Sequence, residues 1–209
     1  MTRYQFIERM LRQIYNGQPS DDASITFGLV NQWLNDGIAL AIKKNYTDSI
    51  GLDGVAYINN SFYSTYSNIT ISNVDYDTWL INLPQIPVGL GKNEGIAMVQ
   101  FVDVKGRNSQ TGVPLSVAQL AYQEQLRPIQ NKIMYWYENN KLYAKSTLML
   151  SAYTGKVRMV SGGDSTDLNS TLIIPDDYVP VIVEYVKGQL AFEKSRPIDS
   201  SNDGVDSPN

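Results

Sequence analysis

The spacing of apolar residues changes twice along this chain, and these changes limit the possible folds more than any single motif. Before about residue 50, apolar side chains recur at the three- and four-residue intervals of amphipathic helices. From residue 55 to about residue 83 the chain is rich in Tyr, Ser, Thr, Asn and Ile, a composition that favours strands. Helical spacing returns after residue 175. The order predicts an α+β fold, in which helices from both ends pack together around an inserted β-rich segment.

Two helices are expected at the N-terminal end. The first spans residues 4–15, and Asn16 followed by Gly17 is a typical helix stop. The second is expected to begin at Ser20 as its N-cap, with two acidic residues in the first turn, and to run to about Asn45. Its apolar stripe predicts that this long helix packs against the first.

A third helix is expected near the C-terminal end. Pro175 suits its first turn, and Asp176 and Asp177 suit the positive end of the helix dipole. The helix is expected to continue to about Lys194, with Pro180 early enough to be tolerated.

The segment between these helices predicts a series of short strands and turns. Asn139 and Asn140 tolerate the positive φ of a tight hairpin, so residues 132–137 and 141–150 are expected to pair. A turn at Thr154 and Gly155 is expected to lead into a strand at 157–160, and residues 105–113 are expected to form a polar loop. The other expected elements are strands at 62–66, 69–71, 78–83 and 96–104, a short helix at 114–126, and a last strand or extended entry at 172–174.

These expectations divide the chain into three parts. Residues 1–50 and 172–196 form a helical base, and residues 51–171 form the β-rich insertion. Residues 197–209 form a polar tail with almost no apolar side chains to bury, so the tail alone is expected to be disordered.

The chain contains neither cysteine nor histidine, and this excludes more functions than any motif supports. Without cysteine there are no disulfides, thiol nucleophiles or thiolate metal sites. Without histidine there is no Ser-His-Asp hydrolysis and no residue that ordinarily transfers protons near neutral pH. Catalysis by carboxylate side chains alone is not excluded, so only a narrow class of enzymes remains possible.

The motifs that resemble catalytic or binding sites have ordinary structural explanations. Residues 89–93 superficially resemble a phosphate-binding loop, but Ile86 stands where its first glycine belongs and Asn93 where a hydroxyl should hold Mg²⁺. The pair Asp75 and Asp77 fits the edge of a strand. We therefore predict no catalytic residue, no cofactor and no metal ligand.

Charge is unevenly distributed in a chain whose net charge is -4. Residues 45–91 contain no Lys or Arg, and neither do residues 159–186, although both segments contain several acidic residues. Solvated faces of mixed sign are one interpretation. The other is a molecule with segregated charge that binds copies of itself.

The sequence shows no sign of membrane insertion or secretion. No apolar run is long enough to span a bilayer. The N-terminus has neither the apolar region nor the cleavage site of a signal peptide. We expect no membrane partner.

Tyrosine is abundant, with 14 residues, and aromatic side chains that are half-buried are enriched in protein interfaces. Strand faces explain many of them, but several fall in two clusters within the predicted strands. The polar tail is a further candidate for contact with a partner. The interface residues predicted on these grounds are Tyr63, Tyr66, Tyr135, Trp136, Tyr137, Pro197, Asp199 and Asp203.

Three features of the chain carry a resemblance to a known family. The first is the opening pair of helices, at residues 6–14 and 27–38, and the second is the β-rich insertion. The third is the ending, with residues 174–178, a helix, and then residues 196–204. Together they resemble the connector ring proteins of crAss-like gut phages and, more loosely, the tail tube adaptors of other short-tailed phages. The resemblance covers most of the chain as an architecture and includes no diagnostic short motif.

The resemblance implies a structural protein of the virion neck or tail, which passes through the host cytoplasm during assembly. It implies a homo-oligomeric, dodecameric ring stacked under the portal protein, in contact with neighbouring ring or tail proteins. Packaged DNA would pass through the lumen without specific binding. It also implies no cofactor and no catalytic residues.

The charge pattern is consistent with such a ring. A ring needs two different, complementary patches on each subunit. A bore that conducts DNA should not retain phosphates, because each neutralised phosphate adds affinity. We therefore expect an acidic bore, lined by some of the acidic residues in 48–77 or 164–177.

Two alternatives remain open. A glycan- or receptor-binding β-module of a phage tail would use the supply of Tyr and Trp. A glycosidase would need two carboxyl groups about 5–10 Å apart in a cleft. The candidates for that pair are Asp75, Asp77, Glu124 and Glu138.

Overall fold

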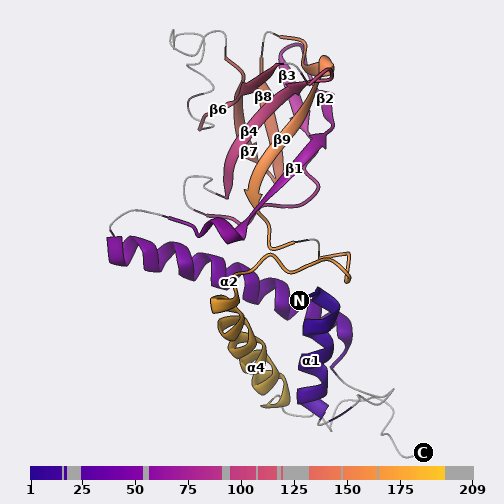
Figure 1. The fold of residues 1–209 in the computed structure, drawn as a ribbon, viewed down its shortest axis with the longest axis vertical. Coiled ribbons are helices and arrows are strands. Elements are labelled where there is room, and N and C mark those ends of the chain that lie inside the picture. The colour runs from indigo at the N-terminus through magenta and orange to yellow at the C-terminus, as the bar shows by residue number, and fades with distance from the viewer. Residues whose placement is uncertain are drawn as a thin grey trace, which may run out of the picture.

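The computed structural model describes most of the chain, and the statements below concern that part. It describes residues 1–15, 17, 25–53, 57–90, 95–106, 108–116, 119, 132–146, 148–163 and 165–195. The helices lie at one end of an elongated molecule and two β-sheets lie at the other (Figure 1). This arrangement confirms the α+β fold class and the helical base that the sequence predicts.

Helix α1, Arg3–Tyr15, begins at a capping box and carries its apolar residues inward. The Thr2 hydroxyl accepts a hydrogen bond from the Gln5 N–H at 3.2 Å, and the Gln5 side chain accepts one from the Thr2 N–H at 2.9 Å. Two N–H groups that the helix leaves without partners are satisfied in this way. Phe6, Ile7, Met10 and Leu11 are buried as a consequence of helical spacing.

Helix α2, Phe27–Asp53, differs from the prediction at both ends. Its cap is Thr26, whose hydroxyl accepts a hydrogen bond from the Leu29 N–H at 3.3 Å; the expected cap, Ser20, is outside the described residues. The helix also continues past Asn45. That side chain bridges to other elements, because it donates to Tyr178 Oη at 2.7 Å and accepts from the Asn59 N–H at 3.0 Å.

Helix α4, Val179–Ser195, follows the 3₁₀ turn η6, Asp176–Tyr178, and crosses α2. Pro180 lies in its first turn, where a missing N–H costs little. The two helices approach closely at Gly37, where an added Cβ would lie 3.1 Å from Ile182 and 3.2 Å from Tyr185. The predicted packing of helices from both ends of the chain is confirmed.

The nine strands in the described ranges form two sheets. The first sheet is antiparallel, in the order β1-β9-β4-β5, and the second, β2-β3-β8-β7-β6, ends in a parallel pair. Two short 3₁₀ turns, η1 (Asn60–Phe62) and η5 (Leu150–Ala152), precede β1 and β9. The strands are β1 (Tyr63–Ile69), β2 (Ile71–Asn73), β3 (Thr78–Ile81), β4 (Ile96–Asp103), β5 (Ser109–Thr111), β6 (Val113–Pro114), β7 (Met134–Glu138), β8 (Lys141–Lys145) and β9 (Tyr153–Val160).

The two sheets share one hydrophobic core. Alternate residues of each strand point inward, as the period of two requires. Both sheets contribute fully buried side chains, among them Val99, Phe101, Val157 and Met159 from the first and Ile81, Leu142 and Ala144 from the second.

A separate core fills the helical base and extends to the first sheet. The helices supply most of it, and Ile58, Phe62 and Val160 add side chains from the segment where the sheet begins. The rings of Phe62 and Tyr178 meet edge to face, with centroids 5.2 Å apart. The base and the sheets are therefore joined by apolar packing as well as by chain connections.

The predicted hairpin is confirmed as β7 and β8, although β8 ends at Lys145 and not at Leu150, which begins η5. Asn139 and Asn140 have φ values of 50° and 61°, as a type I′ turn requires. The expected strands at 62–66, 69–71, 78–83 and 96–104 are confirmed as β1 to β4, with shifted ends.

Three local predictions are wrong. Pro114, the first residue of the expected short helix, instead forms β6 with Val113 beside β7, and the Leu115 N–H bonds to the Tyr135 carbonyl at 2.8 Å. Most of that expected helix lies outside the described residues. Gly155 lies inside β9 and not in a turn; an added Cβ would lie 3.3 Å from Ile69 and Ile81. The polar loop predicted at 105–113 contains β5, which pairs with β4.

The described part of the chain contains no helix with the length and apolar character needed to cross a membrane.

Candidate assembly interface

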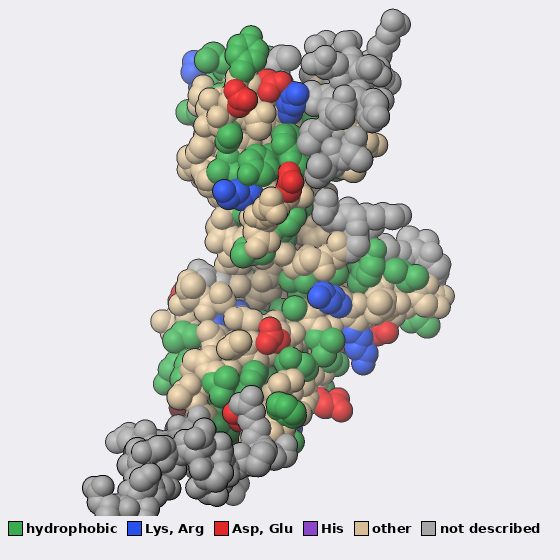
Figure 2. Space-filling model, turned by 180° about the vertical axis from the view of Figure 1, so that it is seen from behind, with side chains coloured by type: hydrophobic (Ala, Val, Ile, Leu, Met, Phe, Trp, Pro, Cys, Tyr) green, Lys and Arg blue, Asp and Glu red, His purple; other side chains and the backbone are tan. Residues whose placement is uncertain are grey.

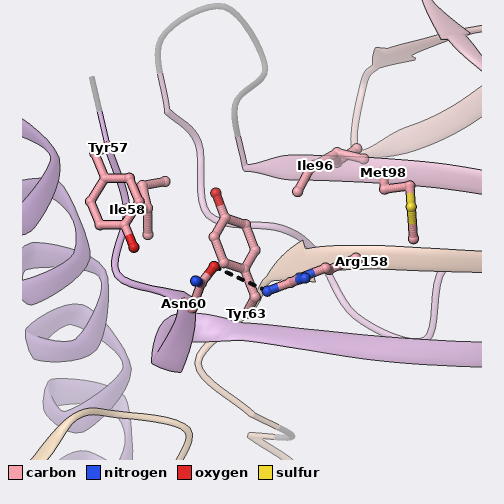
Figure 3. A pocket seen from close by; sticks show the side chains of 8 residues that line it. Tyr57, Ile58, Asn60, Tyr63, Ile96, Met98 and Arg158 are labelled. Atoms are coloured by element: carbon pink, nitrogen blue, oxygen red, sulfur yellow. Dashed lines mark hydrogen bonds between the residues drawn. The ribbon is translucent and has the colours of Figure 1, made fainter. Parts of the chain in front are cut away.

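A groove of about 540 Å³ lies where the chain passes from the helical base to the first sheet. The segment before β1 supplies Tyr57, Ile58 and Asn60, and the strands supply Tyr63, Met98 and Arg158 (Figure 3). Its walls are therefore aromatic and apolar, with one cation among them.

Strand register explains why these side chains meet. Arg158 of β9 lies opposite Thr65 of β1 and opposite Met98 of β4. Tyr63, two residues before Thr65, is therefore its diagonal neighbour on the same face. The guanidinium lies 5.1 Å from the centroid of the Tyr63 ring and donates a hydrogen bond to Asn60 Oδ1 at 3.1 Å.

The described walls of the groove are suited to binding a partner. Arg158 adds a positive charge, and Tyr57 adds an exposed aromatic surface. Among the described residues that line it there is no carboxylate. A protein segment with an acceptor group and an apolar side chain matches these walls.

Tyr66, another predicted interface residue, is used within the subunit. Its hydroxyl donates to Gln85 Oε1 at 3.1 Å and shares a 2.7 Å hydrogen bond with the Ser161 hydroxyl. It thereby ties β1 to the segments that lead back to the helical base.

The three aromatic residues predicted on β7 differ in exposure. Tyr135 lies in the core between the sheets, and burial raises the pKa of its hydroxyl. Trp136 is buried and stacks on Tyr143, with centroids 5.4 Å apart. Tyr137 is half-buried, donates to Asn140 Oδ1 at 3.3 Å, and has its pKa raised by burial. Each of the three makes contacts inside the subunit, and their role between subunits stays a prediction.

The three tail residues of the prediction, Pro197, Asp199 and Asp203, lie outside the described residues.

The structure adds an exposed apolar surface that no sequence pattern indicates, at the end of the sheets farthest from the helices (Figure 1). We call it the distal tip, and it consists of Val74, Tyr76, Val104, Leu148 and Met149. Tyr76 is 97% exposed and Met149 is 77% exposed. Figure 2 shows hydrophobic side chains at this end beside acidic and basic ones.

Hydrogen bonds between loops explain why the distal tip forms. The Ser146 N–H bonds to the Asp77 carbonyl at 2.9 Å, and the Val104 N–H bonds to the Ala152 carbonyl at 3.1 Å. They bring together the β2–β3 turn, the end of β4 and the loop before β9. Each loop alone looks like an ordinary turn, so only the fold reveals the combined surface.

Of the carboxylates considered for a glycosidase, Asp75 and Asp77 lie two residues apart in the turn between β2 and β3, whereas Asp77 and Glu138 are too far apart to form a pair. Asp77 precedes β3 and contacts Lys145 at 3.2 Å, whereas Glu138 lies at the opposite end of β7. The register places them about five residues apart along the strands, roughly 16 Å at 3.3 Å per residue, which exceeds the usual separation. Glu124 lies outside the described residues.

No cluster of three or more potential metal ligands occurs in the described ranges. The acidic residues of the two segments without Lys or Arg are also spread out. Asp48 lies on α2, Asp75 lies at the distal tip, and Asp176 and Asp177 lie in η6 before α4. Asp164 is outside the described residues.

Comparison with known proteins identifies the family. A search of the curated proteins found no match. A protein-family model described as phage tail ring protein 2 matches residues 5–206, which include the helical base and both sheets. The match covers nearly the whole chain, so the chain belongs to the phage tail ring protein 2 family of crAss-like phages, whose members are structural ring proteins of the phage tail.

Proposed function

We propose that this chain forms a ring of the head-to-tail connector, where it extends or seals the DNA channel below the portal protein. The observation that carries the proposal is the family match over residues 5–206. It includes the base and the sheets together, so the proposal applies to the whole architecture.

The shape of the subunit supports a place in a stack of rings. The distal tip presents apolar side chains at one end of the long axis, and the helices occupy the other end (Figure 1). A contiguous apolar surface on a soluble subunit typically marks a contact with another protein. We assign the distal tip to contact with a neighbouring ring, tail or portal protein.

A place in a stack of rings gives each part of the subunit a different contact. Residues 1–50 and 172–196 form the base that contacts adjacent subunits, and residues 51–171 form the insertion. The groove beside Tyr63 receives a segment of a partner, and Pro197, Asp199 and Asp203 of the tail contact a partner ring. Subunits assemble around an axis as a ring of about twelve copies, which is a closed heterologous arrangement.

The chain performs no catalysis in this proposal, uses no cofactor, and lets DNA pass without specific binding. Assembly takes place in the host cytoplasm, and the finished ring resides in the neck or tail of the virion. The competing proposal is a glycan-binding module, and the exposed Tyr57 beside Tyr63 is the feature that favours it.

Purified virions provide the test. We expect quantitative mass spectrometry to find about as many copies per particle as one ring contains. Imaging of the tail should place them in a layer below the portal. Absence from mature virions, or trimeric copies on fibres that bind a glycan array, would contradict the connector proposal.

A further inference from the structure

The groove beside Tyr63 has one charged side chain among the described residues that line it. Arg158 stands on its wall with Tyr57, Tyr63 and Met98 (Figure 3). Lys156 lies two residues before Arg158 and therefore on the same face of β9, outside the groove. The described walls thus combine one positive charge with aromatic and apolar surface.

Arg158 is held in place by neutral neighbours. Its guanidinium donates to Asn60 Oδ1 at 3.1 Å and lies 5.1 Å from the centroid of the Tyr63 ring. In the described part of the chain, no carboxylate forms an ion pair with Arg158. A guanidinium has five N–H donors and binds a carboxylate through two of them. The groove therefore presents a positioned cation that suits a carboxylate from outside the subunit.

The chain itself contains a segment of the opposite charge after its last helix. Residues 197–209 include Asp199, Asp203 and Asp206 and no Lys or Arg. Ile198 directly precedes the first of these carboxylates, so a side chain suited to an apolar wall stands beside one suited to a guanidinium. The family match extends to residue 206 and includes this segment together with the base and the sheets.

The same order of an apolar and an acidic residue occurs again at Val205 and Asp206. The pair Ile198 and Asp199 is favoured because Pro197 precedes it. Proline restricts the backbone of a free segment, so less conformational entropy is lost when that segment binds.

The direction of α4 decides which groove the segment reaches. Tyr178, directly before α4, packs against Phe62, which is adjacent to Tyr63 of the groove. From there α4 runs away from the sheets (Figure 1), and its 17 residues carry Ser195 about 25 Å further at 1.5 Å per residue. Ile198 lies at most about 11 Å beyond Ser195. It therefore cannot reach the groove of its own subunit.

We propose that Ile198 and Asp199 of one copy occupy this groove on the adjacent copy of the ring. The Asp199 carboxylate pairs with the Arg158 guanidinium, and Ile198 packs against Met98. The proposal rests on the ring function proposed above and narrows the contact of the tail, since Asp203 alone remains for a partner ring. Each copy offers a tail and accepts another, and such a heterologous contact gives a ring when the rotation closes.

The absence of native cysteine allows a direct test, because every introduced cysteine reports one position. The variant carries Ala97→Cys and Ile198→Cys in the same chain. Ala97 lines the groove and is exposed. A disulfide needs Cα atoms within about 7 Å, and the length of α4 keeps these two positions farther apart within one subunit. An oxidised bond between them must therefore join two copies.

We expect oxidation of assembled rings to give a ladder of multimers on a non-reducing gel. Either cysteine alone should give no more than a dimer. The matched control combines Ile198→Cys with Ala152→Cys, since Ala152 is also an exposed alanine but lies in η5, before β9. It should give no ladder. A stronger ladder from Val205→Cys with Ala97→Cys would overturn the proposed register.

Charge reversal tests the ion pair. Arg158→Asp in the cysteine pair should reduce the ladder yield about tenfold, which corresponds to about 1.4 kcal/mol. Asp199→Arg should do the same, and both reversals together should restore the yield. A purely structural role of Arg158 inside its own subunit would leave the yield low in the double reversal. Lys156→Asp, on the same face of β9 but outside the groove, is the matched control and should keep the yield of the parent.

The outcomes separate this contact from the ring function. If electron microscopy finds rings neither in the purified protein nor in material released from virions, the proposed function fails. If rings are present and the variant with Ala97→Cys and Ile198→Cys gives no ladder, the contact proposed here is wrong and the function stands. A ladder that neither Arg158→Asp nor Asp199→Arg weakens also overturns it.

Discussion

Tyr135 is buried in the core, although the aromatic cluster around it in the sequence predicts a residue at an interface. It packs between the sheets. Gly112 makes room for its ring, because an added Cβ there would lie 2.8 Å from Tyr135 Cδ1. No sequence pattern indicates this pairing, since the two residues meet only when β6 aligns with β7.

The buried hydroxyl of Tyr135 makes stability depend on alkaline pH. Burial raises its pKa above the ordinary value of 10.0. Above that pH the unfolded chain loses the proton while the folded chain keeps it, so stability falls as pH rises. We expect Tyr135→Phe to weaken the fall in unfolding free energy above pH 10, as measured by urea denaturation. Tyr76→Phe, at the exposed tip, is the control and should keep the slope of the parent.

If the unfolding free energy of Tyr135→Phe fell with pH above 10 as steeply as that of the parent, the pH dependence would not come from Tyr135. The half-buried Tyr137, whose pKa burial also raises, would then be the next residue to replace.

At the scale of elements, the contact between α2 and α4 depends on a small residue. Gly37 lies where the helices cross, against Ile182 and Tyr185. We expect Gly37→Leu to lower the free energy of unfolding by about 1–3 kcal/mol, because it overpacks the contact. Gly28→Ala in the same helix is the matched control. Its added methyl group meets nothing closer than 3.9 Å, so it should not lower stability.

Calorimetry or urea denaturation of the two variants checks this expectation. Equal stability of Gly37→Leu and the parent would mean that α4 moves away from α2 at no cost, which conflicts with a tightly packed base.

The sequence predicts elements well where one local signal is sufficient. The asparagine pair fixes the β7–β8 hairpin, and helical spacing identifies α1 and α4. Element ends that depend on distant partners are predicted poorly. Asn45 reads as the end of a helix, but its bonds to Tyr178 and Asn59 belong to the tertiary structure. Gly155 reads as a turn for the same reason, since the need for a glycine comes from Ile69 and Ile81 across the core.

The candidate contact surfaces were predictable to a smaller extent than the fold. Tyr63 was identified from the sequence, and it lines the groove with Arg158. The groove itself depends on strand register, and the distal tip depends on three loops that meet.

At the scale of the whole molecule, the acidic segments bear on the proposed passage of DNA. Asp176 and Asp177 precede α4, and Asp75 and Asp77 lie near the distal tip, so the two pairs mark different levels of the subunit. We propose that one of these levels lines the bore. An anionic bore repels phosphate and keeps the affinity for DNA low.

Reversal of each pair to lysine distinguishes the two levels. When the pair that lines the bore is changed to lysine, rings should retain linear DNA. The affinity for DNA should fall steeply with salt, because each neutralised phosphate contributes about -0.9 to the slope of log affinity against log salt concentration. The pair outside the bore serves as the matched control, since its reversal adds the same charge elsewhere. Retention measured by gel shift at two salt concentrations checks the prediction. If neither reversal increases retention while rings still form, acidic residues at these positions do not line the channel, and the proposed charge of the bore is wrong.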